Sequence, residues 1–375
     1  MTSPVIFSTL HTASGHLFGM ATLNNPAALN ALTLPMIELL DAQLVQWAGQ
    51  DNIAGVIIAA EGDKAFCAGG DVVSLHHAAK KAAQSGAKAG EAPPEAAEFF
   101  EKEYRLDYRI HTYPKPVLCW AHGIVMGGGV GLMMGASHRV VSPNARVAMP
   151  EIHIGLFPDV AGSWFLQRVP HNAGLFLGLT GAIINSGDAL HCKFADVVIE
   201  HSKFPEVLDE IRNSHWAGIG QNDRKTLSTL LAPFSTETPA PLLLQHQQEI
   251  SEVVSHGSAA AVHAALLKLL GHPDTWLNRA ASSYVHGSPT SAALFQHLYQ
   301  RLKNASLAEV FRIEYQAAVG CCAHHDFPEG VRALLVDKDK NPKWSVKDVE
   351  EVAESTLAEI LRPRFKGAHP LDDLH

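Results

Sequence analysis

The chain has 375 residues, 47% of them hydrophobic, and a formal net charge of −9. This length and apolar content allow a substantial core, in one large domain or in a domain with an appendage. The negative charge and the lack of a basic stripe argue against a nucleic-acid partner. No run reaches the roughly 18 apolar residues of a membrane-spanning helix. The first residues show no targeting pattern, so we expect a cytoplasmic protein without a membrane partner.

The five cysteines and 22 histidines do not show the spacings of a metal site or a disulfide framework. The cysteines are odd in number and irregularly spaced, which is typical of reduced thiols. The pairs His76–His77 and His324–His325 are adjacent, not four residues apart on a helix. We therefore expect no metal ion and interpret these histidines as solvated surface residues.

Strands and helices are expected to alternate over the first half of the chain. Short apolar or β-branched runs predict strands at 5–7, 16–23, 54–60, 116–121, 138–141, 146–148 and 197–199. Caps and apolar periodicity predict helices that begin after Thr33, at 98–110, near Gly128, over 160–168 with Asp159 as cap, and from a cap at Ser186 to about 193. Residues 78–97 have almost nothing to bury and predict a mobile surface loop. This alternation indicates the α/β class.

The second half of the chain has a different character. Helical periodicity is found at 205–213, 239–255, 259–271, 289–303, 306–319 and 346–361. We therefore expect a largely helical C-terminal region and divide the chain into residues 1–203, 204–362 and a tail at 363–375.

Two glycine turns follow apolar strands. The first is KAFCAGGD at 64–71, and the second is the run from Gly127 into a predicted helix. Backbone N–H groups at a helix start favour negative charge. The N–H groups of Gly70 and Gly128 could therefore converge on one carbonyl oxygen as an oxyanion hole. A single glycine turn is more often only a tight connection, and the spacing does not fit a dinucleotide-binding motif.

Two acids, Glu151 and Asp159, follow the second glycine turn within an otherwise apolar stretch. The simplest interpretations are a surface carboxylate for Glu151 and a helix cap for Asp159. Carboxylates in apolar surroundings usually have a partner or a task, which slightly favours function. A nucleophilic serine is excluded because no G-x-S-x-G motif is present.

These motifs resemble the crotonase (enoyl-CoA hydratase/isomerase) superfamily. The matching pieces are NP at 25–26, LNAL at 29–32, KAFCAGGD at 64–71, HGIVMGGG at 122–129 and MPEIHIG at 149–155. The resemblance implies a spiral of ββα turns, with residues 1–203 as the acyl-CoA-binding and catalytic core. It also implies that Gly70 and Gly128 hold the thioester oxygen. Coenzyme A would be part of the substrate, so no separate cofactor is expected.

The sequence departs from the hydratases at one catalytic position. Hydratases carry a catalytic Glu two residues after the glycine run, where this chain has Gly131, and glycine cannot transfer a proton. Asp159 stands where the hydratases have a glycine. Glu151 with Asp159 resembles the 3-hydroxyisobutyryl-CoA hydrolase branch, as do FFEKEY at 99–104, GSPTS at 287–291, EY at 314–315 and the stretch 325–344. In that branch the position of Glu103 contacts the substrate.

The resemblance implies hydrolysis of a short branched 3-hydroxyacyl-CoA, with 3-hydroxyisobutyryl-CoA of valine degradation as the expected substrate. Glu151 would activate water or attack the thioester, and the sequence does not choose between these routes. Asp159 would orient water or the 3-hydroxyl group and assist proton transfer, while Glu103 would contact the acyl hydroxyl group or hold a neighbouring cation. Weaker candidates for the CoA phosphates are Lys64, Arg332, Lys338 and Lys343.

Two alternatives remain open at this point. The chain could be an enoyl-CoA hydratase or isomerase, which Gly131 disfavours. It could also be a non-catalytic acyl-CoA-binding or assembly subunit, which the retained acids and glycine turns disfavour. Many crotonase relatives form trimers through a C-terminal helical segment. A homo-oligomer is therefore compatible with the sequence, although a longer tail could fold back on its own subunit.

Overall fold

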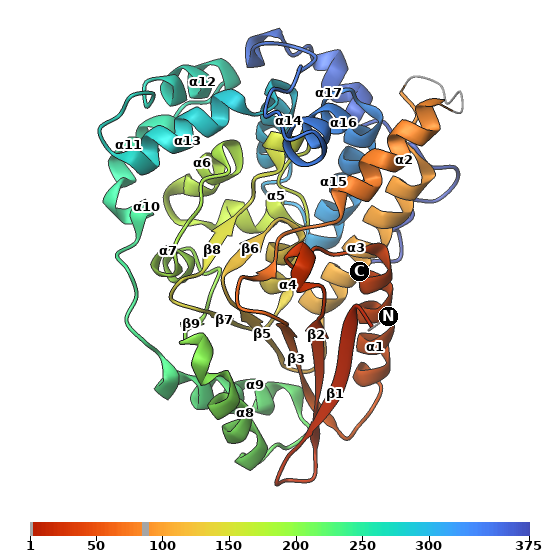
Figure 1. Ribbon diagram of the computed structural model, residues 1–375, viewed down its shortest axis with the longest axis vertical. Coiled ribbons are helices and arrows are strands. Elements are labelled where there is room, and N and C mark those ends of the chain that lie inside the picture. Colours follow the sequence, from red (N-terminus) through yellow and green to blue (C-terminus); the bar gives the residue numbers. More distant parts are fainter. Residues whose placement is uncertain (1–2, 85–89) are drawn as a thin grey trace. The chain divides into compact units, whose positions relative to one another are not determined.

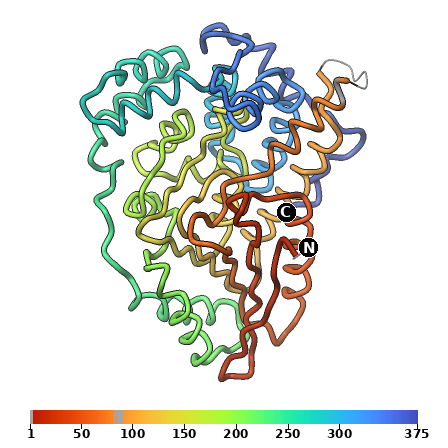
Figure 2. The backbone as a smooth tube through the Cα atoms, viewed as in Figure 1, coloured from red at the N-terminus to blue at the C-terminus, as the bar shows by residue number. Residues whose placement is uncertain are grey.

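The computed structural model describes residues 3–84 and 90–375. The chain forms two compact units, each assembled from three stretches. Unit 1 comprises Met1–Gly70, Arg105–Val147 and Ile184–Leu242, and unit 2 comprises Asp71–Tyr104, Ala148–Ile183 and Leu243–His375. Figure 2 colours the chain by residue number, so that these stretches can be followed one after another. The division at 203 and 362 proposed from the sequence stays a prediction.

Two sheets carry the strands (Figure 1). The larger sheet has the order β1 (Val5–His11), β2 (Leu17–Leu23), β3 (Ile53–Ala60), β5 (Val117–Ala121), β7 (His138–Val141) and β9 (Val197–Val198). The smaller sheet has the order β4 (Ala65–Cys67), β6 (Ile124–Met126) and β8 (Arg146–Ala148). Strands β1 and β2 pair antiparallel, whereas the pairs from β2 to β9 in the larger sheet are parallel.

The two sheets arise from a repeated turn of the chain. In three successive turns, a strand of the larger sheet is followed within a few residues by a strand of the smaller sheet: β3 by β4, β5 by β6, and β7 by β8. A helix follows the second strand in the first two turns, α2 (Val72–Gln84) after β4 and α4 (Gly128–Gly135) after β6. This is the predicted α/β spiral of ββα turns.

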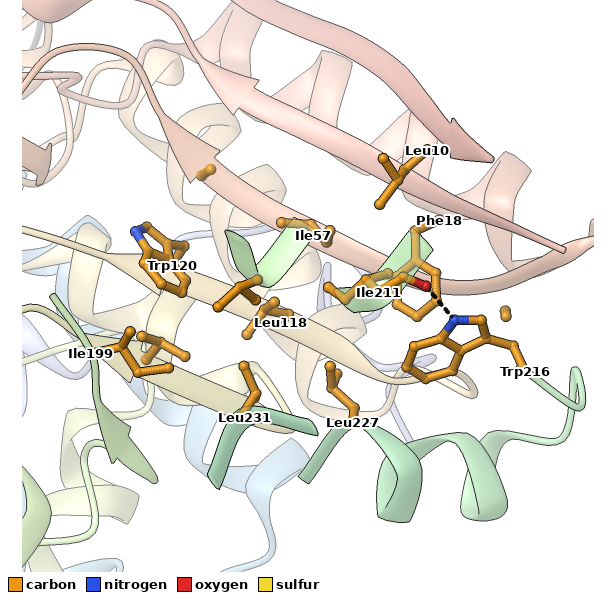
Figure 3. Close-up of a cluster of buried hydrophobic side chains, with 14 residues drawn as sticks. Leu10, Phe18, Ile57, Leu118, Trp120, Ile199, Ile211, Trp216, Leu227 and Leu231 are labelled. Atoms are coloured by element: carbon orange, nitrogen blue, oxygen red, sulfur yellow. Dashed lines mark hydrogen bonds between the residues drawn. The ribbon is translucent and has the colours of Figure 1, made fainter. Parts of the chain in front are cut away.

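The core of unit 1 lies between the larger sheet and the helices that cover it. Strand β3 is an unbroken apolar run, as expected for a parallel strand covered on both faces. Helix α9 (Gly220–Leu231) packs against β3 and β7. The indole N–H of Trp216 donates to the carbonyl of Ile211 at 2.8 Å, and its ring lies 4.5 Å from that of Phe18 (Figure 3). A buried indole with its N–H satisfied adds apolar area without an unpaired donor.

The remaining helices of unit 1 are mostly short. They are η1 (Pro26–Ala28), α1 (Leu34–Ala48), α7 (Ser186–His191), η5 (His201–Lys203), α8 (Phe204–Asn213) and η6 (Ala232–Phe234). Helix α3 (Pro94–His111) belongs to unit 2 as far as Tyr104 and to unit 1 beyond it. The predicted cap of α1 is confirmed, because the Thr33 side chain accepts a hydrogen bond from the Met36 N–H.

Unit 2 is almost entirely helical, as expected for most of the C-terminal region. Besides α2 it contains η2 (Glu151–Ile154), α5 (Gly162–Phe165), η3 (Leu166–Arg168), η4 (Pro170–Asn172), α6 (Ala173–Thr180), α10 (Leu242–Gln245), α11 (Gln247–Val254), α12 (Ala259–Leu267), α13 (Thr275–His286), α14 (Pro289–Arg301), α15 (Leu307–Ala323), α16 (Asp326–Val331), the π-helical η7 (Arg332–Val336), η8 (Val349–Glu351) and α17 (Glu354–Ile360). Four α-helices, α9 of unit 1 and α6, α13 and α16 of unit 2, were not predicted.

Several local predictions were wrong. The expected loop at 78–97 is shorter, because α2 continues to Gln84 and α3 begins at Pro94; residues 85–89 of this loop lie outside the described residues. The cap of α7 is Asn185 and not Ser186, since the Asn185 side chain accepts from the Asp188 N–H and the Asp188 carboxylate accepts in return. In the described part of the chain, no helix is long and apolar enough to cross a membrane.

Candidate functional site

The two glycine turns lie side by side in unit 1. Gly69 (φ +113°) and Gly127 (φ +51°) have backbone conformations that other residues rarely adopt. A Cβ atom on Gly69 would lie 3.5 Å from the Met126 carbonyl oxygen and 4.0 Å from the Gly128 nitrogen. A Cβ on Gly129 would lie only 2.4 Å from the Cys67 carbonyl oxygen, so the start of α4 packs directly against β4. The glycines therefore allow a close approach of two backbones.

The predicted donors sit at these turns. Gly128 is the first residue of α4, which has no side-chain cap, and Gly70 forms a bridge with Leu32 next to β4. In residues 3–84 and 90–375, the N–H groups of Gly70 and Gly128 donate no described hydrogen bond. Unpaired N–H groups at a helix start suit a developing negative charge. Their use as an oxyanion hole stays a prediction.

The two acids lie in unit 2 and are both buried. Glu151 opens η2 and is 6% exposed, and Asp159, which follows Pro158, is 4% exposed. Burial raises the pKa of Glu151 well above its usual value, and the nearby charge of Asp159 raises it further. A surface carboxylate, the simplest interpretation of Glu151, is therefore wrong. Two buried carboxylates whose charges interact favour a state with one proton and one negative charge between them.

Asp159 is bound by a tyrosine and does not cap a helix. The Tyr104 hydroxyl group, fully buried on α3, donates to Asp159 Oδ2 at 2.7 Å. Helix α5, which follows, has no side-chain cap, so the predicted capping role is wrong. Burial raises the pKa of Asp159 to about 6, while the hydrogen bond from Tyr104 acts in the opposite direction. Burial, followed by the charge of Asp159, raises the pKa of the Tyr104 hydroxyl group.

The two acids differ in their hydrogen bonds. Asp159 accepts the Tyr104 hydroxyl proton, which stabilises its ionised form. Glu151 Oε2 is buried and has no hydrogen-bond partner in the described part of the molecule. A buried carboxyl oxygen without a donor favours the protonated form. The shared proton is therefore expected on Glu151 and the negative charge on Asp159.

Glu103 precedes Tyr104 on α3 and is 3% exposed. Its negative charge contributes to the raised pKa of Tyr104, which lies in the same environment as Asp159. The structure thus places Glu103 in the same buried acidic region of unit 2 as Asp159. The proposed contact with the acyl hydroxyl group stays a prediction.

Another buried acid is Glu314 on α15, part of the motif at 314–315, to which the sequence assigned no role. Its Oε2 atom accepts the Ala161 N–H at 2.7 Å, and its Oε1 atom accepts the Ser163 N–H at 2.8 Å. Burial raises the pKa of Glu314 to about 8, against the hydrogen bond from the Ser163 N–H. Ala161 and Ser163 lie more than 150 positions before Glu314 in the sequence, so no local pattern predicts these contacts.

The C-terminal motifs support the helix that carries Glu151. The Ser288 N–H donates to the Ile152 carbonyl at 2.9 Å, and the Ser288 hydroxyl donates to Asp326 Oδ2 at 2.6 Å. A Cβ atom on Gly155 would lie 2.3 Å from the Asp326 carbonyl, so η2 ends in direct contact with α16. The motifs at 287–291 and 325–344 are therefore structural neighbours of Glu151.

A cavity of about 380 Å³ in unit 1 is lined by parts of the motifs at 25–26, 29–32 and 64–71. It is lined by Pro26, Ala27, Leu29, Asn30 and the segment Glu61 to Ala65. Asn30 joins the two segments, since its side chain accepts the Asn25 N–H and donates to the carbonyls of Glu61 and Ala65. Lys64 lines this cavity, which supports it as a candidate for an anionic ligand.

Arg332 is engaged elsewhere. Its guanidinium group forms ion pairs with Glu329 at 2.9 Å and with Asp337 and Asp339 at 2.7 Å. Three carboxylates already satisfy its charge, which argues against Arg332 as a phosphate ligand. Lys338 and Lys343 stay candidates.

One of the paired histidines does not lie at the surface. His76 is buried, with its Nδ1 atom 2.9 Å from the Pro328 carbonyl oxygen, and burial lowers its pKa. The surface interpretation is wrong for His76, whereas His77 and His325 are exposed as predicted. All five cysteines are buried, and none of them forms a disulfide bond within residues 3–84 and 90–375. In the part of the chain that the structure covers, no group of three or more His, Cys, Asp or Glu side chains could hold a metal ion; the absence of a metal stays a prediction.

Comparisons with known proteins agree with this architecture. The sequence profile of the enoyl-CoA hydratase/isomerase family matches residues 18–361. A solved structure from Rhodobacter sphaeroides 2.4.1, described as an enoyl-CoA hydratase, is 34% identical with a TM-score of 0.81, and the match covers 96% of this chain and 98% of that one. The crotonase-like fold is thereby confirmed.

Two relatives carry different names. The chain is 36% identical to the "3-hydroxyisobutyryl-CoA hydrolase, mitochondrial" of Xenopus tropicalis, over 90% of this chain and 85% of the relative. It is 31% identical to the "Small ribosomal subunit protein mS47" of Neurospora crassa, over 93% of this chain and 69% of the relative. The first relative is named as mitochondrial, so the predicted cytoplasmic location stays a prediction. By its fold, its motifs and the extent of these matches, the chain belongs to the enoyl-CoA hydratase/isomerase (crotonase) family.

Proposed function

We propose that the protein hydrolyses the thioester of a short branched 3-hydroxyacyl-CoA, with 3-hydroxyisobutyryl-CoA as the first candidate. The observation that carries this proposal is the buried pair of Glu151 and Asp159, with Tyr104 bound to only one of the two acids. The name of the Xenopus tropicalis relative supports the choice of substrate. Valine degradation is the pathway in which this substrate occurs.

The reaction needs stabilisation of the oxyanion, a base for water and an acid for the sulfur. The N–H groups of Gly70 and Gly128 would supply the first, an effect worth about 3–4 kcal/mol for each donor. Asp159, ionised with the help of Tyr104, would take a proton from the attacking water. Glu151 would give its proton to the departing sulfur as the carbon–sulfur bond breaks.

The protons balance over one turnover. Water loses one proton to Asp159 and adds its oxygen to the thioester carbon, and the thiolate leaves with the proton of Glu151. The acid pair again holds one proton, now on Asp159, and its return to Glu151 resets the pair. The carboxylic acid product ionises in solution.

This assignment reverses the roles expected from the sequence, in which Glu151 was the base or the nucleophile. Attack by Glu151 on the thioester would form a mixed anhydride and place oxygen from water in its side chain. Multiple turnovers in ¹⁸O-labelled water, followed by mass spectrometry of the peptide that contains Glu151, separate the routes. We expect no label in Glu151; label in that carboxylate would favour the anhydride route.

The hydratase alternative remains relevant because the Rhodobacter sphaeroides structure is described as an enoyl-CoA hydratase. Gly131 lacks the proton-transferring group of the hydratases, as the motif comparison implied. Parallel assays of crotonyl-CoA hydration and thioester cleavage test this choice. Hydration as fast as cleavage would contradict the proposed hydrolysis.

The Neurospora crassa relative keeps a non-catalytic role as a second candidate, because its name places it in a ribosomal subunit. The net charge of −9 argues against direct contact with RNA, and a buried, unpaired carboxyl oxygen on Glu151 has no evident structural purpose. Binding of acyl-CoA without release of free thiol would favour the non-catalytic role. A homo-oligomer stays a prediction for either function.

A further inference from the structure

Glu314 is a buried carboxylate that has no step in the proposed reaction. It is completely buried on α15 and accepts hydrogen bonds from the N–H groups of Ala161 and Ser163 at 2.7 and 2.8 Å. Both oxygens are thus occupied by backbone donors. These donors belong to the segment that directly follows Asp159. Glu314 is therefore connected to Asp159 through one short piece of backbone.

That segment has an unfavourable backbone conformation. Val160 (φ +50°) and Ala161 (φ +68°) are both in the left-handed region. A β-branched residue such as valine rarely adopts positive φ, and two consecutive non-glycine residues in this region are held only when their surroundings require it. The turn is closed by the Gly162 N–H, which donates to the Asp159 carbonyl at 2.6 Å.

The contact with Glu314 also has an electrostatic cost. The negative charge of Asp159 contributes to the raised pKa of Glu314, so the two carboxylates lie close enough to repel each other. A hydroxyl or amide side chain, without this repulsion, commonly accepts N–H groups at the start of a helix. A carboxyl group offers separate acceptor oxygens to the Ala161 and Ser163 N–H groups, which suits a turn that must be held against strain.

We propose that Glu314 is a positioning residue, which holds Asp159 in its reactive orientation by clamping the strained turn at Val160 and Ala161. Glu314 acts through the backbone: it fixes residues 161 and 163, these fix the turn, and the turn directs the Asp159 carboxylate to the Tyr104 hydroxyl group. The kinetic part of this proposal rests on the proposed thioester hydrolysis, whereas the structural part does not.

The clamp predicts a specific rescue. Glu314→Gln keeps the size of the side chain but leaves one acceptor oxygen for two N–H groups, and we expect kcat to fall about 10- to 100-fold while KM changes much less. Glycine adopts positive φ without steric cost. Ala161→Gly in the Glu314→Gln background should therefore restore a large part of the lost kcat, because the turn then needs less support.

A general loss of packing would behave differently. Removal of the buried Ala161 methyl group from an already weakened protein would lower stability and activity further. A double variant no more active than Glu314→Gln alone would therefore overturn the proposal. Glu309→Gln, an exposed acid on the same helix, is the matched control and should keep wild-type kcat.

Amide hydrogen exchange tests the clamp without any substrate. We expect at least one of the Ala161 and Ser163 amides to exchange at least about 10-fold faster in Glu314→Gln, because only one acceptor oxygen remains for the two N–H groups. Amides in the middle of α15 should keep their rates. Unchanged exchange at both positions in folded Glu314→Gln protein would overturn the clamp.

The two readouts separate this proposal from the proposed function. If the wild-type protein releases no thiol from any acyl-CoA but the exchange rates change as expected, the hydrolase assignment fails and the clamp stands. If Glu314→Gln does not fold, the Ala161→Gly double variant should recover folded protein for the same reason. Failure of that recovery would also overturn the clamp.

Discussion

The hydrogen bond from Tyr104 to Asp159 should control the acid limb of the pH–rate profile. Tyr104→Phe removes a donor that lies 2.7 Å from a buried carboxylate, and the phenylalanine ring can keep the contacts with Phe100 and Phe311. A hydrogen bond to a charged group stabilises it by about 1.5–3 kcal/mol. Since one pKa unit corresponds to about 1.4 kcal/mol, the pKa of Asp159 should rise by roughly 1–2 units.

The expected effect on activity follows from this shift. Hydrogen bonding to the ionised form lowers a carboxyl pKa, so removal of the donor raises the pKa of Asp159 from about 6. With a shift of about 1.5 units, the ionised fraction at pH 7 falls from about 0.9 to about 0.25. The value of kcat/KM at pH 7 should therefore fall roughly fourfold, with a smaller loss on the alkaline side of the limb.

The assay is thiol release from 3-hydroxyisobutyryl-CoA, measured between pH 5 and 9 for wild type and Tyr104→Phe. Tyr113→Phe is the matched control, because it removes a buried hydroxyl that donates to the Leu44 carbonyl in unit 1. The control should leave the acid limb in place. An unshifted acid limb in Tyr104→Phe, or an equal shift in the control, would refute the assignment of Asp159 as the ionised member of the pair.

Three further predictions concern Glu151, the glycine turns and Asn30. Burial raises the pKa of Glu151, so its contribution to stability falls as pH rises above the usual value of 4.5. Glu151→Gln removes this cost and should raise the melting temperature at pH 7.5 by about 2–4 °C. The same variant should abolish most thiol release. A lower melting temperature at every pH in calorimetry would contradict this prediction. Gly129→Ala places a Cβ atom 2.4 Å from the Cys67 carbonyl oxygen and should lower kcat by about 100-fold or more by displacing the donor at Gly128, whereas wild-type kcat would show that the turns tolerate separation. Asn30→Ala leaves the Glu61 and Ala65 carbonyls without their donor, and the free energy of unfolding in urea should fall by about 2–4 kcal/mol; a change below about 0.5 kcal/mol would contradict the role of Asn30 as a link.

The sequence was most informative where a local pattern determines the structure. Strand β3 is a continuous apolar run, and Thr33 stands immediately before a helix with one apolar face, so both were predicted correctly. The glycines at 69 and 127 mark positions of positive φ, and close packing of the two turns follows from the missing Cβ atoms. Such features depend on the chemistry of a few adjacent residues.

Other features depend on residues far apart in the chain. Asp159 resembles a helix cap locally, but its partner is Tyr104, 55 residues earlier. In the sequence Glu314 is indistinguishable from any other glutamate on a helix, and only the fold shows that it accepts the Ala161 N–H. The burial of Glu151 and His76 likewise results from packing that no local pattern records. The family motifs pointed to Glu151 and Asp159 as candidate catalytic acids, whereas the structure shows that both are buried and that Tyr104 binds Asp159.

The central claim is that Glu151 and Asp159 act together in the cleavage of a thioester. Its most direct test is the rate of free-thiol release from a small panel that contains 3-hydroxyisobutyryl-CoA, crotonyl-CoA and acetyl-CoA, with wild type, Glu151→Gln and Glu309→Gln compared side by side. We predict fastest release from 3-hydroxyisobutyryl-CoA, a loss of at least about 100-fold in Glu151→Gln and no change in Glu309→Gln. Wild-type thiol release by Glu151→Gln would contradict the claim.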